Sequence, residues 1–322
     1  CMGNSRPTCV HNPASGREAH WPQVIPKAGG SKKAVVVGAG PAGLEAARVL
    51  GERGHRVKVF EAADQPGGQL RLAAAPHWRK DIASIIDWRI SEFEHLGVDL
   101  TLNNYAETEQ VLAEEPDVVI VATGGIPDLE WLPGGELATP LWDVLSGAAK
   151  VAGQVVVYDG TGRSSALSAV DVCHHGGAAV SLYLLDPLPG AELDYGERII
   201  WRRELAKNNI AVNADYRLLE LVQAKTNVIA RFCHELTDEL IEVDADHVLV
   251  EHGTLPMDDL YRELVPSSSN GGVTDFSTLL AGDPQPTLQD SQGFALYRIG
   301  DAQSSRNLAA AMFDALRLCS RI

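Results

Sequence analysis

The sequence lacks any apolar run that approaches membrane-spanning length, and it has few positive charges. Lysine and arginine together number 27, against 43 aspartates and glutamates, which gives a formal net charge of −16. An acidic chain argues against nucleic acid or an anionic membrane surface as a partner, because both attract basic patches. With 322 residues, 45% of them hydrophobic, we expect a globular protein of about two domains.

Closely spaced cysteines are also absent. The five cysteines are odd in number, no C-x-x-C occurs, and no signal peptide precedes them, which is typical of a protein from a reducing cytoplasm. No start signal or ordered element is evident before the second cysteine, so we expect the chain to be a piece of a longer polypeptide. The cysteines are Cys1, Cys9, Cys173, Cys233 and Cys319.

Motifs for zinc binding and for hydrolysis are missing as well. The histidines have no zinc-type spacing, and Ser164 and Ser165 lack the G-x-S-x-G context of a hydrolase nucleophile. His174 and His175 stand just before two glycines. We interpret them as the C-terminal end of a helix, which is favoured over a metal site.

One stretch, residues 33–61, has the complete pattern of a dinucleotide-binding βαβ unit. An apolar run enters G-x-G-x-x-G, a helical stretch follows, and a second apolar run ends on an acid. In the helix, the apolar residues are predicted to turn inward, whereas Glu45, Arg48 and Glu52 share another face. A lone glycine motif is weak, but these elements in this order predict a Rossmann-like unit.

The glycine motif itself indicates where phosphates bind. Gly38 allows the tight turn, Gly40 lets the backbone approach a pyrophosphate, and Gly43 lets the helix pack closely on the strand. The first helical turn, with Pro41 and Ala42, directs N–H groups and the positive end of the helix dipole at the phosphates. The sequence therefore predicts a site for FAD or for ADP alone.

Other segments are predicted to end at the same edge of the sheet, where ligands bind open parallel sheets. An acid follows the second strand and is placed to accept hydrogen bonds from the ribose, and a glycine-rich turn permits close backbone approach. Apolar runs at 117–121 and 294–299 supply two more strand ends. The cofactor-binding residues predicted from these segments are Glu61, Ala62, Gly68, Gln69, Gly124, Gly300 and Asp301.

A second βαβ pattern begins near residue 154, and a strand and helix of the first type return at residues 294–322. The second unit is therefore predicted to be inserted into the first, giving an α/β fold of two nested Rossmann-like domains. The predicted parts are a connector at residues 1–31, an FAD- or ADP-binding domain at 32–128 and 284–322, and an inserted NAD(P)-binding-like domain at 129–283.

The second glycine turn, residues 159–165, departs from the nucleotide-binding pattern. Ser165 replaces the third glycine, which should push helix and strand apart. Asp159 puts a carboxylate beside the pyrophosphate position and opposes its binding unless Arg163 compensates. Asp186 ends the next strand where an NAD-selecting acid belongs, so NAD(P)H binding stays open. We predict a degenerate site that does not work in nicotinamide reduction.

The motifs together resemble those of known flavoproteins. VVVGAGPAGLEAA, FEAADQPGGQ, VIVATGG and YRIGDA are similar to two-dinucleotide-domain reductases with a glutathione-reductase-like, three-layer ββα fold. The whole chain resembles the C-terminal half of the trimethylamine dehydrogenase and 2,4-dienoyl-CoA reductase family. The resemblance is closest to dimethylglycine and N-methylproline demethylases, through CVHNPASGRE, SIIDWR, HGTLPMDDLY, LVPSSSN and IGDAQSSRN.

This resemblance implies a TIM barrel, in the N-terminal part of the polypeptide, that oxidises an amine at FMN and passes electrons to a 4Fe-4S cluster. Cys9 matches the family's last cluster ligand, and the other ligands would precede Cys1. The implied partners are that barrel portion and further copies of the protein in a homo-oligomer, and an electron-transfer flavoprotein is one candidate acceptor. No catalytic residue is assigned in this chain, because hydride chemistry belongs to the flavin.

Two other functions remain open at this point. One is an NAD(P)H-dependent flavin reductase of the 2,4-dienoyl-CoA reductase type, which turnover of nicotinamide would reveal. The other is a non-catalytic module that holds ADP and supports the barrel or mediates assembly. Tightly bound ADP without flavin absorbance would favour that second function.

Overall fold

The computed structural model describes residues 9–286 and 293–322. Contacts within the chain divide it into two compact units, which are described separately. Unit 1 contains the described residues 9–70, 83–126, 254–286 and 293–322, and unit 2 consists of 71–82 and 127–253. Two of these boundaries differ from the prediction, which placed 254–283 in the second domain and 71–82 in the first.

Packing explains both differences. In unit 1, helix α8 (Asp259–Leu264) inserts Leu264, which is fully buried, into the hydrophobic core that contains Val119 and Leu296. In unit 2, the segment 71–82 packs through Trp78, whose ring centroid lies 4.8 Å from that of Trp201. Neither contact is visible as a local sequence pattern, because the partner residues are far away along the chain.

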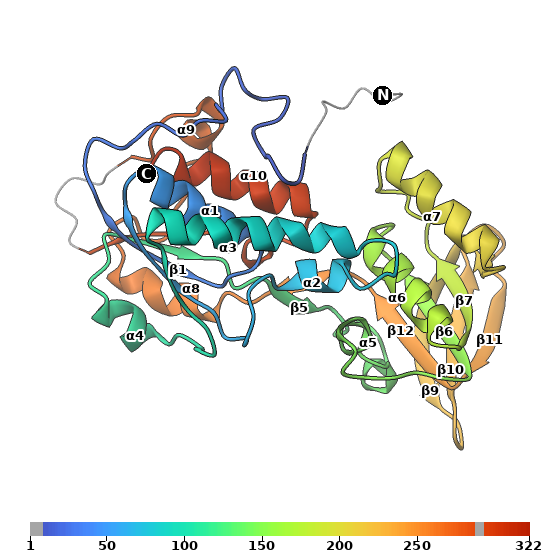
Figure 1. Ribbon diagram of the computed structural model, residues 1–322. Helices are drawn as coiled ribbons and strands as arrows, with labels where there is room; N and C mark the ends of the chain where they lie inside the picture. The colour runs from blue at the N-terminus through green and yellow to red at the C-terminus, as the bar shows by residue number, and fades with distance from the viewer. Residues whose placement is uncertain (1–8, 287–292) are drawn as a thin grey trace. The chain divides into compact units, whose positions relative to one another are not determined.

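Unit 1 is built on a five-stranded parallel sheet in the order β14-β4-β1-β2-β3. Helices α1, α3 and α10 lie side by side over this sheet (Figure 1), and α1 contacts both of the others. Helices α4 and α8 contribute Val111 and Leu264 to the core formed with Val35, Val37 and Val121. The bounds are β1 Lys33–Val37, α1 Pro41–Glu52, β2 Arg56–Phe60, α3 Ser84–Leu96, β3 Asp99–Thr101, α4 Thr108–Ala113, β4 Val118–Val121, β14 Ala295–Arg298 and α10 Leu308–Cys319.

Helix α1 is held by ion pairs that are buried rather than solvated. Glu45 is fully buried and bonds Arg48 at 2.6 Å and Arg89 of α3 at 2.8 Å. The sequence had suggested a polar face made of Glu45, Arg48 and Glu52. Two of these side chains are buried because α3 covers them and supplies Arg89, so that each buried charge has a partner.

Unit 2 has three layers. A four-stranded parallel sheet, β12-β6-β7-β8, lies between helices on one face and an antiparallel sheet, β11-β10-β9, on the other. Alternate residues of β6 face opposite ways, so Val155 and Val157 meet the helices while Val156 and Tyr158 meet the antiparallel sheet. The bounds are α5 Leu141–Ser146, β6 Gln154–Asp159, α6 Ser164–His175, β7 Ala179–Leu184, α7 Tyr195–Lys207, β8 Ala211–Asn213, β9 Tyr216–Gln223, β10 Val228–His234, β11 Leu240–Ala245 and β12 His247–Glu251.

The remaining elements are short. Among the described residues, no helix has the length and apolar character needed to cross a bilayer.

Strands β5 and β13 pair with each other in a two-stranded sheet. The bounds are α2 Gln69–Ala73, η1 Lys80–Ala83, β5 Gly125–Pro127, η2 Gly135–Leu137, β13 Thr254–Pro256, η3 Val265–Ser267, α9 Phe276–Ala281 and η4 Gly300–Ala302.

Candidate nucleotide-binding site

Two of the three motif glycines are required by the packing of the chain itself. Gly38 has φ of +100°, and a Cβ there would collide with the backbone of Ala122 at the end of β4. A Cβ on Gly43 would overlap the carbonyl oxygen of Gly38. The two glycines therefore let the β1–α1 turn close tightly against the neighbouring strand end, as the motif predicts.

Gly40 is different, because no packing contact in the described part of the chain requires a glycine there. Its φ of −71° suits any residue, and among the described residues no heavy atom lies within 4 Å of a Cβ built on it. Gly40 is the N-cap of α1, Pro41 begins the helix, and no described side chain caps this end. Helices α3, α4, α5, α6 and α8 likewise have no side-chain cap, whereas α7, α9 and α10 are capped by Asp194, Asp275 and Asn307. The open space and the helix N–H groups fit a pyrophosphate.

Glu61 lies against the same turn. Its Oε2 accepts a hydrogen bond of 2.6 Å from the backbone N–H of Ala39, and its Oε1 accepts one of 2.8 Å from the N–H of Ala63. These bonds fix the carboxylate, yet each oxygen keeps a further lone pair for a ribose hydroxyl. Glu61 is partly exposed and Ala62 beside it is exposed, so both are accessible to a ligand.

The glycine-rich turn after β2 also reaches the first turn. The N–H of Gly67 donates to the carbonyl of Ala39 at 2.8 Å. Gly68 has φ of +49°, and a Cβ built on it would stand 3.2 Å from the Cα of Gly40. Gln69 then begins α2 and donates to Asp301 Oδ2 at 3.1 Å. Gly68 and Gln69 are thus next to the motif, where the sequence placed them.

The last strand brings Gly300 and Asp301 to the same edge. A Cβ on Gly300, which has φ of +62°, would stand 2.9 Å from the Cβ of Ala42, so this glycine packs on the first turn of α1. Asp301 also accepts hydrogen bonds from the Thr254 hydroxyl and from the Arg306 N–H, both at 3.3 Å. Sequence reasoning did not assign Thr254 and Arg306 to the site. They lie in HGTLPMDDLY and IGDAQSSRN, two segments that carry the family resemblance, but neither residue type marks a nucleotide site by itself.

Gly124 follows β4, whose last residue pairs with the last residue of β1. It has φ of +78°, and its carbonyl accepts a hydrogen bond of 3.0 Å from the N–H of Met257. The Thr123 hydroxyl donates to the Met257 carbonyl. Met257 belongs to HGTLPMDDLY, and this pairing gives that segment a structural role that its sequence did not indicate.

Cys9 is exposed and has a free thiol. The segment after it is tied to unit 1, because buried Arg89 donates to the carbonyl of His11 at 3.0 Å. Among the residues that the structure describes, the one cluster of three or more potential metal ligands does not include Cys9. Its role as a cluster ligand therefore stays a prediction that needs further cysteines.

In the second glycine turn, the side chain of Asp159 binds the backbone N–H groups of the turn itself. Asp159, which is 1% exposed, ends β6 where β1 has Val37. Its Oδ1 accepts hydrogen bonds from the N–H groups of Thr161 at 3.0 Å and Gly162 at 2.9 Å, and Oδ2 is buried with no hydrogen-bond partner among the described residues. Burial raises the pKa of Asp159 to about 6. A carboxylate thus occupies N–H groups of the kind that would bind a phosphate.

More negative charge surrounds this turn. Asp186 lies very close to Gly162: a Cβ built on Gly162 would stand 2.6 Å from Oδ2 of Asp186. Burial, followed by the charges of Glu192 and Asp215, raises the pKa of Asp186. Together with Asp159 these are four acids near one turn, and their charges oppose a dianionic pyrophosphate. That the site is degenerate stays a prediction.

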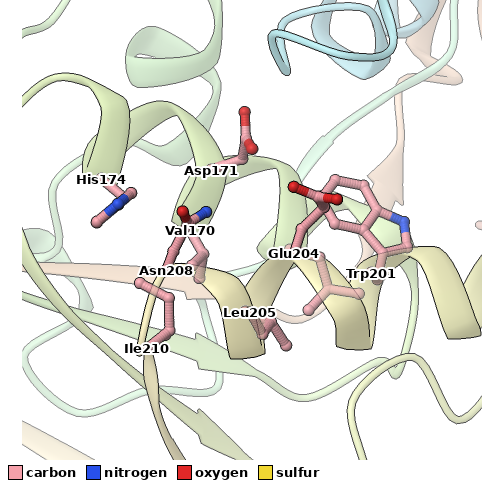
Figure 2. Close-up of a pocket in the computed structure, with 9 residues that line it drawn as sticks. Val170, Asp171, His174, Trp201, Glu204, Leu205, Asn208 and Ile210 are labelled. Atoms are coloured by element: carbon pink, nitrogen blue, oxygen red, sulfur yellow. The ribbon is translucent and has the colours of Figure 1, made fainter.

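A pocket elsewhere in unit 2 lies between α6 and α7 (Figure 2). It does not include residues 159–165, so it is not the nicotinamide site that the sequence left open. Its lining mixes apolar and polar side chains: Leu167, Val170, Asp171, His174, Trp201, Glu204, Leu205, Asn208 and Ile210.

The parallel sheet, the closed glycine turn and the carboxylate after β2 define the class to which unit 1 belongs, the Rossmann-like dinucleotide-binding domains. The family model described as "NAD(P)-binding Rossmann-like domain" matches residues 36–96, which cover α1 to α3.

Comparison with known proteins gives a more particular placement. The chain is 46% identical over 99% of its length to the "Multifunctional alkene reductase/demethylase OYE" of Caballeronia cordobensis, and 44% identical over 98% of its length to a "Probable N-methylproline demethylase" of Rhizobium meliloti. It spans about half of each relative, 48% and 47%. Among solved structures, a 2-naphthoyl-CoA reductase is 26% identical with a TM-score of 0.80, over 98% of this chain and 43% of that one.

Proposed function

We propose that unit 1 binds the ADP part of FAD, or ADP itself, within a flavin- and iron-sulfur-dependent oxidoreductase. The chain is the C-terminal portion of that enzyme, which oxidatively demethylates or dehydrogenates a small N-methylated amine. The observation that carries the nucleotide site is the open space at Gly40, at the N-terminus of α1 and beside Glu61. The substrate class rests on the names of the two relatives, both of which include a demethylase.

Each group of site residues contacts a different part of the nucleotide. Gly40, Pro41 and Ala42 surround the pyrophosphate, with the tight turn held by Gly38 and Gly43. Glu61 and Ala62 bind the adenosine ribose, and Gly68 and Gln69 contact the next segment of the nucleotide. The far side of the site is lined by Gly124, Gly300 and Asp301. A bound flavin supplies the hydride chemistry, and the residues of this chain bind and orient it.

The rest of the enzyme is part of the same proposal. The two units are two nested domains of glutathione-reductase-like type, with the second inserted into the first. FMN and the 4Fe-4S cluster belong to a preceding TIM-barrel portion, and Cys9 is the last cluster ligand. The proposed partners are that barrel, further copies in a homo-oligomer and an electron-transfer flavoprotein.

We further infer that unit 2 does not use NAD(P)H, because Asp159 occupies the N–H groups of its glycine turn. This disfavours the reductase of the 2,4-dienoyl-CoA type. It supports a second candidate function, a module that holds ADP without chemistry, since a flavin in unit 1 would then lack a nicotinamide hydride donor.

The nucleotide can be identified directly. The purified chain is denatured and the supernatant is separated chromatographically. FAD supports the flavin function, and ADP without flavin absorbance supports the ADP-holding module. Recovery of neither, together with no measurable affinity for either, would show that the proposed site is wrong.

Nicotinamide use is tested on the longer polypeptide that contains the barrel. The enzyme is mixed anaerobically with NADH and, separately, with NADPH while flavin absorbance is followed. We expect no rapid bleaching. Rapid bleaching by either nucleotide would overturn the inference about unit 2 and assign the protein to the reductase branch.

A further inference from the structure

A cluster of ligand-type side chains lies in unit 2, outside its glycine turn. It consists of His77, Asp171 and His175, called here the His-Asp-His cluster. Asp171 and His175 stand at positions i and i+4 of α6, which project from one face of a helix. His77 comes from the segment 71–82, 94 residues before Asp171. The fold therefore adds a third residue to a pair that the helix already places together.

The distances within the cluster are short. The Nδ1 of His77 lies 3.0 Å from Oδ1 and 3.1 Å from Oδ2 of Asp171, and the Nδ1 of His175 lies 3.6 Å from Oδ1. The two imidazole centroids are 4.2 Å apart. One ligand atom from each residue lies within 4.8 Å of the other two. Ligand atoms on one zinc ion are about 3 to 4 Å apart, so small side-chain rotations suffice.

Burial and hydrogen bonding prepare the cluster for an ion. The Asp171 side chain is 4% exposed, whereas those of His77 and His175 are 48% and 42% exposed. The carboxylate is fixed further by the backbone N–H of His77, which donates to Oδ2 at 3.1 Å. The Nδ1 of His175 lies 2.8 Å from the carbonyl of Asp171. A metal ion bound at this Nδ1, which lies 3.6 Å from Asp171 Oδ1, would replace that hydrogen bond.

An ion pair alone accounts less well for this arrangement. Both imidazoles converge on one buried carboxylate, and their centroids are only 4.2 Å apart. A divalent cation gives all three side chains a common partner, whereas an ion pair uses only one of the two imidazoles. The sequence analysis favoured a helix-end role for His174 and His175 because two glycines follow them. His77, 94 residues before Asp171, gave no sign of a third ligand.

We propose that His77, Asp171 and His175 bind a divalent transition-metal ion of the zinc class. Two imidazoles and one carboxylate form a ligand set of the type that zinc takes when water completes the coordination. The exposed histidines give the ion a path from solvent. Once bound, the ion joins the segment 71–82 to α6 and stabilises the fold of unit 2. This site is independent of nucleotide binding in unit 1.

The test uses the full 322-residue chain, stripped with a chelator and kept reduced. Titration calorimetry with ZnCl₂ is expected to give one saturable equivalent per chain. H77Q and H175Q are each expected to weaken binding by at least about tenfold. H174Q is the matched control and is expected to bind zinc as the wild type does. It changes the neighbouring histidine of the same helix, which lines the pocket between α6 and α7 (Figure 2).

A second measurement identifies the ligands. Cobalt(II) added in place of zinc is expected to give a visible d–d spectrum that H77Q and H175Q abolish. Because Asp171 is buried, D171N can unfold the protein, and the two exposed histidines therefore carry the test. The proposal is overturned by the absence of a saturable site, by wild-type affinity in H77Q, or by a sulfur-to-cobalt charge-transfer band, which would assign the metal to cysteine.

Discussion

Glu61 and Ala39 are joined by a hydrogen bond of 2.6 Å from the backbone N–H of the glycine turn to the carboxylate that follows β2. This bond links the glycine turn, proposed to bind the pyrophosphate, with the carboxylate proposed to bind the ribose. The same carboxylate is held on its other oxygen by Ala63. Its position is therefore set before any ligand arrives, which lowers the cost of ordering on binding.

Substitution E61Q tests this arrangement. Glutamine removes the charge and one acceptor oxygen, and hydrogen bonds to charged groups contribute about 1.5 to 3 kcal/mol. We expect the affinity for ADP to fall by about tenfold or more in a calorimetric titration. The control is E52Q on α1, whose carboxylate pairs with Arg48 instead, and it should leave the affinity unchanged. If E61Q and the wild type bind ADP with equal affinity, Glu61 does not contribute to nucleotide binding.

Gly40 gives the sharpest test of the pyrophosphate position. Since its φ is ordinary and the described chain leaves its Cβ position open, G40V should fold normally. The valine side chain fills the space proposed for the phosphates, so nucleotide binding should be lost. G29V serves as a control, because Gly29 also has open space around it and lies outside the turn. The readouts are nucleotide content and thermal unfolding, and a folded G40V that keeps its nucleotide would contradict the proposal.

The buried ion pairs beneath α1 predict a large effect on stability. R89L leaves buried Glu45 with Arg48 as its remaining partner, and breaking a buried pair costs about 3 kcal/mol or more. The exposed pair of Arg203 with Glu204 is the comparison, and R203L should cost less than about 1 kcal/mol. Urea unfolding of both variants measures the difference. Similar losses for the two would mean that Glu45 is not stabilised by Arg89.

Periodic and motif-bearing segments were predicted well, and residues that depend on distant partners were not. The elements from β1 to β2, the strand β4 and the helix α10 follow from local patterns of apolar residues and glycines. The burial of Glu45 follows from Arg89, which is 44 residues away. The domain boundary depends on Leu264 in a helix of six residues, too short to show a clear period.

The candidate site shows the same division. Gly38, Gly40, Gly43 and Glu61 belong to one continuous motif and lie together as the motif requires. The contacts of Asp301 with Gln69 and Thr254 form only when the chain folds, because 232 and 47 residues separate them. Similarly, the sequence showed that the Asp159 carboxylate lies beside the predicted pyrophosphate position. Only the structure showed that this carboxylate accepts hydrogen bonds from two backbone N–H groups of the turn.

Asp159 makes stability depend on pH in a defined window. Its pKa of about 6 in the folded protein exceeds the ordinary value of 3.8, because burial disfavours the charged form. The folded state therefore holds a proton that the unfolded state releases between about pH 4 and pH 6, and stability falls as the pH rises through that range. Above pH 6 the carboxylate is charged in both states, and the penalty stays constant.

Substitution D159N removes this titration while keeping an oxygen that can accept from Thr161 and Gly162. We expect the unfolding free energy of the wild type to drop relative to D159N by about 2 to 3 kcal/mol between pH 4 and pH 7. Urea unfolding of the two proteins across this range measures the difference. Curves that remain parallel would show that Asp159 does not titrate in the window.

Cys9 is predicted to ligate a cluster in the longer polypeptide. The segment after it is anchored, because Arg89 of α3 donates to the carbonyl of His11, so the thiol stands at the start of a fixed stretch of chain. A single thiolate cannot hold a 4Fe-4S cluster, since such clusters take four cysteine ligands. The measurement therefore needs a longer polypeptide that includes the proposed upstream cysteines. C9S is expected to lower iron and sulfide content, while C233S, at another free cysteine, should keep both. An undiminished cluster in C9S would make Cys9 an ordinary connector residue.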